Sequence, residues 1–414
     1  MSIQVFKETK FKNITISLRF RSPLSEDTMN AKMIVSDLLS NVCAKYPDKR
    51  SITNKLDVLY GASLSSNYIT YGKVQVVELK AKIIQPKYIN NKEDLINKVL
   101  QLMKEFIYYP KMDDRQMIDA DLIKESKRIV TSKITRTIDE PAQYASLAAL
   151  LVCGKGFPLG IQIVNQLDKI KMISQETITE TYLNLNKEQL DIIVIGSVDE
   201  KAVKEQLLHA FPNAINTKKM ESSYLFEPIV ELQNASEKRD ISQTYISMVY
   251  KTSQLNTDDN FWKLMVANGI FGQTPSSLLF REVREKHSLC YSIHSGLMAY
   301  DGTMVVNVGV DPTNTEKTIS LIDEQFQRVC KGDFNIEIMD TVKEMLANMF
   351  INQQDDVFGI LNFKYRDILI DDTLDVETVI NKIRAVTLDD VKTVFNKCSL
   401  IMTYQLGKDC EQCA

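Results

Sequence analysis

The chain has 414 residues, which is more than one ordinary hydrophobic core accommodates, so we expect at least two domains. Hydrophobic residues make up 44% of the chain and charged residues 25%, as in an ordinary soluble globular protein. The small formal charge of −4, without a cluster of lysine and arginine, argues against a nucleic-acid partner.

The N-terminal stretch MSIQVFKETKFKNITISLRF alternates polar and apolar residues and has no apolar segment typical of a secretory signal. No run of about 18 apolar residues occurs anywhere, so the sequence predicts no membrane span. The seven cysteines are scattered, which is typical of reduced thiols in a cytoplasm. Cys410 and Cys413 form a C-x-x-C pair, but no strand-then-helix pattern surrounds it, so we interpret both as free surface thiols. We therefore expect a cytoplasmic protein.

The first half contains a recognisable order of elements. Residues 73–83 predict a strand with one apolar face, formed by Val77, Leu79, Ala81 and Ile83. Residues 92–106 have the apolar spacing of an amphipathic helix. Within residues 169–182, Ser174 is predicted to be the N-cap of another helix, and an apolar strand follows over residues 191–198.

The second half repeats this order. Residues 302–310 predict a strand with the apolar face Met304, Val306, Val308 and Val310, and a helix pattern follows over residues 315–329. Residues 382–395 align without a gap to the earlier helix and place Thr387 where that helix has Ser174. The strand 399–407 then matches the strand 191–198.

This repeat predicts an α+β protein made of two duplicated α+β units. Each unit is expected to contain an antiparallel-rich sheet covered by helices on one face. We place the N-terminal unit at residues 1–215 and the C-terminal unit at residues 241–414. The polar, weakly periodic residues 216–240 are the expected linker.

The elbow segment, residues 276–296 (SSLLFREVREKHSLCYSIHSG), joins a charged helix end to an aromatic strand pattern. It resembles the C-terminal-half signature of the pitrilysin/insulinase-type metallopeptidases, the family that includes mitochondrial processing peptidase. The matched positions are Arg284, Glu285, Lys286, Leu289 and Tyr291. Members of that family are built from a duplicated α+β unit, in agreement with the repeat.

The resemblance implies that Arg284 and Tyr291 are catalytic and substrate-binding residues that reach a zinc site in a different α+β unit. Amide hydrolysis builds negative charge on the carbonyl oxygen, and a tyrosine hydroxyl can stabilise that charge. An arginine can hold the backbone carbonyls of a peptide. Composition alone favours a different reading, a solvated arginine at a helix end and a half-buried strand tyrosine.

The zinc-binding half of the family's site is missing from the sequence. In the family it consists of H-x-x-E-H on the first helix of the N-terminal half and a later glutamate. Aligning residues 30–47 with that helix places Lys32, Val35 and Ser36 at the three chemical positions, and none of them can bind zinc or activate water. A stray metal site at His287 and His294 is an alternative to two ordinary histidines.

The sequence therefore resembles the non-zinc-binding subunit of a bacterial heterodimeric peptidase. We expect no cofactor in this chain and no hydrolysis by the chain alone. Zinc and metalloendopeptidase activity would require a homologous H-x-x-E-H partner acting on a peptide substrate. Two alternatives stay open: a structural or peptide-binding protein of the same fold, and a thiol enzyme that uses Cys290 and His287.

Overall fold

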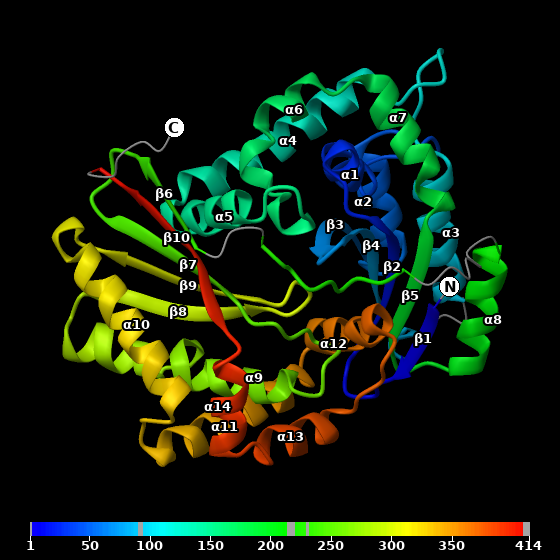
Figure 1. Cartoon of the computed structure of the whole chain (residues 1–414). Helices are drawn as coiled ribbons and strands as arrows, with labels where there is room; N and C mark the ends of the chain where they lie inside the picture. Colours follow the sequence, from blue (N-terminus) through cyan, green and yellow to red (C-terminus); the bar gives the residue numbers. More distant parts are fainter. Residues whose placement is uncertain (1, 90–93, 213–219, 229–231, 409–414) are drawn as a thin grey trace. The chain divides into compact units, whose positions relative to one another are not determined.

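The computed structural model describes residues 2–89, 94–212, 220–228 and 232–408. The Cys410 and Cys413 pair lies outside the described residues, and the expected linker 216–240 is described only in part. The chain forms two compact units, each centred on a five-stranded sheet (Figure 1). Unit 1 comprises Met1–Ile134, Gln166–Glu221 and Val357–Leu369, and unit 2 comprises Thr135–Asn165, Ser222–Asp356 and Ile370–Ala414.

The sheet of unit 1 has the strand order β1-β5-β2-β4-β3, in which β1 runs parallel to β5 and the other pairs are antiparallel. Its strands are β1 (Ser2–Lys7), β2 (Asn13–Pro23), β3 (Ser63–Tyr71), β4 (Val74–Ile84) and β5 (Gln189–Gly196). Its helices are α1 (Glu26–Leu38), α2 (Lys49–Val58), α3 (Leu95–Tyr108), most of α4 (Ala120–Asp139), α6 (Leu167–Met172), α7 (Gln175–Asn184), α8 (Glu200–Ala210) and nearly all of α12 (Val357–Ile370).

The sheet of unit 2 has the equivalent order β6-β10-β7-β9-β8, again with one parallel pair, β6 with β10. Its strands are β6 (Gln233–Lys238), β7 (Thr244–Lys251), β8 (Cys290–Met298), β9 (Thr303–Val310) and β10 (Ser399–Gly407). Its helices are α5 (Pro141–Cys153), α9 (Phe261–Asn268), α10 (Thr315–Lys331), α11 (Ile336–Gln353), α13 (Val376–Arg384) and α14 (Leu388–Phe395), with two π-helical segments at Gly269–Gln273 and Phe280–Lys286.

The duplication predicted from the sequence is confirmed at the level of strand register. In unit 1, Leu18 of β2 pairs with Leu79 of β4, and in unit 2, Met248 of β7 pairs with Val306 of β9. The predicted apolar faces of β4 and β9 are buried throughout. Ser174 and Thr387 both cap helices as expected, since each side chain accepts a hydrogen bond from the backbone N–H three residues later.

The compact units are not contiguous in sequence, because each contains one helix from the other half of the chain. Helix α5 packs on β7 and β10 of unit 2, and helix α12 belongs to unit 1 (Figure 1). The ranges 1–215 and 241–414 thus describe the order of the repeat rather than compact bodies. The expected linker also contains a strand, β6, whose polar sequence QNASEK lacks the apolar alternation that would have predicted it.

Helices α12 and α5 pack against sheet faces that differ in polarity, because the unit 1 face carries buried charges and the unit 2 face is apolar. In unit 1, Arg19 of β2 pairs across the ladders with Glu78 and Asp191, and all three side chains are buried. The Arg19 guanidinium lies 3.0 Å from the Glu78 carboxylate and 4.1 Å from the ring centroid of Tyr365 on α12. A buried ion pair and an aromatic ring therefore form the contact between this sheet and α12.

In unit 2 the equivalent ladder positions are apolar. Val249 of β7 pairs with Val305 and Met402, and these residues belong to one core cluster with Ala145 and Ala149 of α5. On the opposite face of β7, Tyr250 stacks against Phe326 of α10 at a centroid distance of 5.0 Å. Helices therefore cover both faces of this sheet, with α5 on one face and α10 on the other. The sequence predicted helices on one face.

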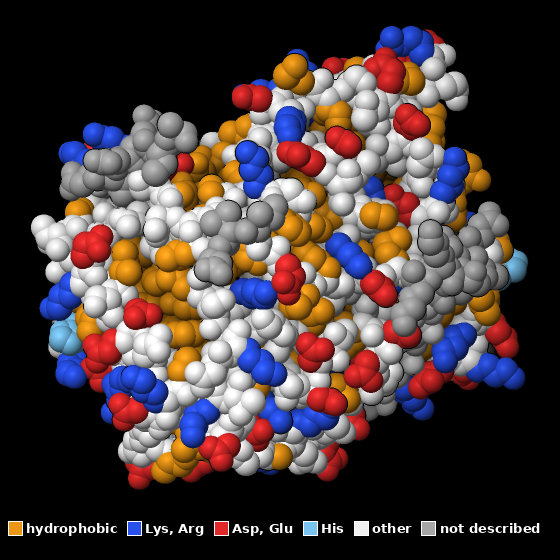
Figure 2. Space-filling view, viewed as in Figure 1, with side chains coloured by type: hydrophobic (Ala, Val, Ile, Leu, Met, Phe, Trp, Pro, Cys, Tyr) orange, Lys and Arg blue, Asp and Glu red, His pale blue; other side chains and the backbone are white. Residues whose placement is uncertain are grey.

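Charge is evenly mixed over the visible surface. On the face drawn in Figure 2, lysine and arginine side chains are interspersed with aspartate and glutamate, and no broad basic area gathers there. Among the described residues, no helix combines the length and hydrophobicity needed to cross a lipid bilayer.

Candidate functional site

The helical part of the elbow segment is wound more loosely than an α-helix. Residues Phe280–Lys286 form a π-helix, and the His287 N–H donates to the Glu282 carbonyl at 3.1 Å, five residues back. Val283 is fully buried and anchors this turn in the core of unit 2. Such π-helical turns are rare and occur often at functional sites.

A sharp turn reverses the chain after this helix. Ser288 has a φ of 52°, in the left-handed region that most side chains avoid, and the chain then enters β8. The ladder between β8 and β9 is irregular between Cys290 and Ile293. Tyr291 lies in this irregular stretch with 85% of its surface exposed, so it is not the half-buried strand aromatic that composition favoured.

The turn brings Arg284 and Tyr291 side by side. The guanidinium carbon of Arg284 lies 5.4 Å from the ring centroid of Tyr291 and 4.4 Å from that of Phe280. Arg284 is half-buried, and within the described part of the chain its guanidinium makes no hydrogen bond or ion pair. Its donors are therefore available for an acceptor from outside this chain.

The acidic residue on the same helix is already engaged. Glu282 accepts from Lys286 Nζ at 2.7 Å and from Arg328 of α10 at 3.4 Å. The Lys286 hydrogen bond, and to a smaller extent Arg328, hold the pKa of Glu282 below its usual value. Because Glu282 is neutralised by these two cations, it does not neutralise Arg284.

Thiol catalysis finds little support at Cys290. Burial raises the pKa of this thiol to about 11, although the nearby charge of Arg284 opposes the shift. A thiol with such a pKa is protonated at neutral pH and is a poor nucleophile. No hydrogen bond connects Cys290 with His287 among the described residues, and that same part of the chain holds no cluster of three metal-ligating side chains.

The positions aligned with the family's zinc motif lie on α1 in unit 1. The Lys32 ammonium is buried and contacts the Ser22 hydroxyl and the Glu188 carboxylate. Burial lowers the pKa of Lys32 and raises that of Glu188, while their mutual attraction opposes both shifts. A buried ammonium repels a metal ion, so these residues do not fit zinc.

The other two positions aligned with the zinc motif, Val35 and Ser36, also do not fit a metal ion. Val35 and Ser36 are buried, and the Ser36 carbonyl accepts a hydrogen bond from the Ser66 hydroxyl of β3. An aliphatic side chain and a serine offer neither a zinc ligand nor a base able to activate water. The side chains that α1 buries at these three positions therefore do not fit a zinc ion.

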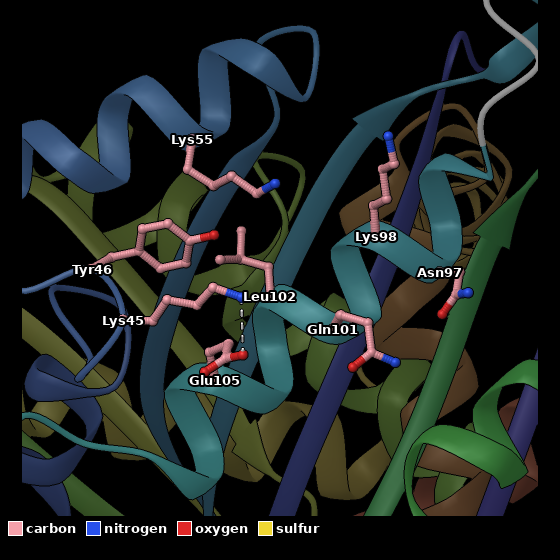
Figure 3. Close-up of a pocket in the computed structure, with 8 residues that line it drawn as sticks. All are labelled: Lys45, Tyr46, Lys55, Asn97, Lys98, Gln101, Leu102 and Glu105. Carbon is pink, nitrogen blue, oxygen red and sulfur yellow. Dashed lines mark hydrogen bonds and ion pairs between the residues drawn. The ribbon is translucent and has the colours of Figure 1, made fainter.

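Unit 1 also has a surface pocket of about 190 Å³, which is lined by residues other than those of the elbow segment. Its lining residues are Lys45, Tyr46, Lys55, Asn97, Lys98, Gln101, Leu102 and Glu105. Lys45, Lys55 and the Tyr46 hydroxyl extend toward Leu102, and Lys45 lies 3.5 Å from Glu105 (Figure 3). The lining holds one carboxylate, which lies beside Lys45, and no histidine or thiol.

The sequence predicts Arg284 and Tyr291 as site residues but does not predict the side chains that contact them. Phe280 precedes Arg284 by four residues, a spacing that brings helical side chains together, and this was the available signal. The link from Glu282 to Arg328 joins residues 46 positions apart, and no local pattern reveals it.

Comparisons with known proteins agree with the fold and with this incomplete site. Residues 173–346 match the family model described as Peptidase M16 inactive domain. The probable inactive metalloprotease YmfF of Bacillus subtilis is 27% identical over 407 residues, which cover 98% of this chain and 95% of that protein.

Two solved structures share the fold along nearly the whole chain. A conserved protein from Enterococcus faecalis superposes with a TM-score of 0.91 at 23% identity, covering 99% of this chain and 97% of its own. A peptidase M16 inactive domain from Pseudomonas fluorescens gives a TM-score of 0.79 at 16% identity, covering 100% of this chain and 97% of its own.

Proposed function

Because residues 173–346 match the Peptidase M16 inactive domain and the chain lacks the H-x-x-E-H zinc motif, we propose that it is the substrate-binding subunit of a two-chain zinc peptidase. A homologous partner chain with an H-x-x-E-H motif supplies the metal and the general base. This chain supplies Arg284 and Tyr291, which hold the peptide and stabilise the transition state in the partner's active site.

The observation that carries the proposal is the guanidinium of Arg284, which makes no hydrogen bond or ion pair within the described part of the chain. A half-buried arginine without a carboxylate partner keeps its donors available for an acceptor from another chain. The acidic side chain on its own helix, Glu282, is held by Lys286 and Arg328. A peptide backbone carbonyl is an acceptor that a guanidinium binds well.

The exposed position of Tyr291 suits a role in a site completed by another chain. Its hydroxyl can donate to the scissile carbonyl oxygen as negative charge develops there, which stabilises the transition state more than the ground state. Strand β8, which begins at Cys290, is the last strand in its sheet order. An extended peptide can add to such an edge through main-chain hydrogen bonds.

The proposal is tested by mixing the purified chain with its H-x-x-E-H partner and following peptide cleavage. Arg284→Ala and Tyr291→Phe are each expected to lower kcat/KM about a hundredfold, because each removes a donor to the reacting peptide. Arg281→Ala, which removes an exposed arginine from the same π-helix, serves as the matched control and is expected to cleave normally. Wild-type cleavage by the Arg284→Ala, Tyr291→Phe double variant would contradict the proposal.

A purely structural or peptide-binding role without peptidase involvement is the alternative. The buried contact between Lys32 on α1 and Glu188 favours this alternative, because a buried ammonium at this position does not fit a metal ion. That role predicts no H-x-x-E-H partner and peptide binding that does not depend on Arg284. Affinity purification from the source cells separates the two, because only the first role predicts recovery of a homologous zinc-bearing chain.

A further inference from the structure

The proposed function requires Arg284 to keep one orientation before any peptide arrives, and we propose that Phe280 is the positioning residue that provides it. This inference rests on the proposed function and adds to it a residue that does not touch the substrate. The ring of Phe280 holds the guanidinium by its face, so that the nitrogen donors stay directed outward.

The geometry separates the two aromatic neighbours of Arg284. The Phe280 ring centroid lies 4.4 Å from the guanidinium carbon, whereas that of Tyr291 lies 5.4 Å away. Phe280 is half-buried, but Tyr291 is 85% exposed and retains freedom to move. The closer and more buried ring is the better support for the cation.

The helix below Phe280 is fixed at two further points. Val283 is fully buried, and Glu282 is joined to Arg328 of α10. Phe280 and Arg284 lie four residues apart on this anchored turn, so their side chains lie next to each other. An aromatic stack on a fixed helix leaves the donors of Arg284 unused, whereas a carboxylate partner would have occupied them.

Preorganisation of this kind lowers the cost of binding. An arginine that is free to rotate loses conformational entropy when it grips a peptide, and this loss weakens the complex. Removing the ring is expected to raise KM roughly two- to fivefold, the equivalent of one cation–π contact, with little change in kcat. A Phe280→Tyr variant keeps the ring and is expected to restore the wild-type KM.

The full-length chain alone tests the positioning directly. In ¹⁵N spectra of the arginine side chains, the Arg284 Nε–Hε signal is identified by its absence from an Arg284→Lys variant. The ring face is expected to shift this signal upfield from the other arginines. The shift should become much smaller in Phe280→Leu and in Phe280→Met, where only the more distant Tyr291 ring remains, and it should persist in Phe280→Tyr. An unchanged signal in the two variants without a ring overturns the inference.

Cleavage in the presence of the H-x-x-E-H partner distinguishes this inference from the proposed function. If Arg284→Ala slows cleavage but Phe280→Leu and Phe280→Met leave KM unchanged, Phe280 has no positioning role and the proposed function stands. If the Nε–Hε shift depends on the ring but Arg284→Ala cleaves normally, the stack exists and the proposed function fails. Unchanged thermal unfolding of Phe280→Met excludes a merely structural loss.

Discussion

Asp301 lies in the turn between β8 and β9 and is 6% exposed. Burial raises the pKa of its carboxyl from 3.8 to about 6, although a hydrogen bond from Tyr224 opposes the shift. The folded chain therefore binds this proton more tightly than the unfolded chain. The stabilising effect is fully present below pH 3.8 and is lost as the pH rises through about 6.

Replacing this carboxyl should therefore stabilise the protein at neutral pH. Asp301→Asn, which cannot ionise, is expected to raise the free energy of unfolding at pH 7 by about 1–3 kcal/mol and to give no gain near pH 4. Urea denaturation at both pH values measures the difference, with the exposed Asp259→Asn as the control. An equal effect of Asp301→Asn at the two pH values would show that burial does not control this group.

At the same residue scale, the sequence singled out Arg284 and Tyr291 as candidate site residues but did not predict how they are supported. They could be singled out because the motif around them is local and contiguous. Their contact depends on the left-handed turn at Ser288, and the engagement of Glu282 depends on the distant Arg328. Neither a positive φ at a serine nor a contact between distant residues follows from periodicity.

At the scale of elements, the buried pair of Arg19 and Glu78 determines how β2 and β4 meet α12. Burial alone would raise the pKa of Glu78, but Arg19, the Ser17 hydroxyl and Lys80 together lower it. Both charges are buried, so removing one leaves the other without compensation. The equivalent ladder positions in unit 2 are Val249 and Val305, which shows that the fold accepts an apolar pair there.

A double-mutant cycle tests this difference between the two sheets. Glu78→Val alone is expected to lower the free energy of unfolding by about 3–5 kcal/mol, because Arg19 stays buried without the carboxylate of its ion pair. Adding Arg19→Val should recover much of that loss, since the pair then resembles Val249 and Val305. Urea denaturation of the two single variants and the double variant gives the coupling. Purely additive losses would contradict this description of the pair.

The elements themselves were well predicted where their pattern is local. The capped helices at Ser174 and Thr387 and the apolar faces of β4 and β9 were all confirmed. Strand β6 was missed because its residues are polar and it stands at the end of its sheet order, beside β10. The exchange of α5 and α12 could not be predicted, because an apolar stripe shows which face a helix buries but not which sheet covers it.

At the scale of the whole molecule, one α+β unit occurs twice with different chemistry. The unit 1 copy has no H-x-x-E-H motif, and Lys32 on α1 places a buried positive charge beside Glu188. The unit 2 copy presents Arg284 with its donors unpaired among the described residues. We infer that the chain keeps the features that bind substrate and depends on another chain for the metal.

The most direct test measures bound zinc and peptide cleavage for the pure chain, alone and after addition of an H-x-x-E-H partner. We predict no stoichiometric zinc and no turnover by the chain alone, and turnover in the mixture that requires both Arg284 and Tyr291. One zinc per chain together with turnover in the pure preparation would contradict this prediction.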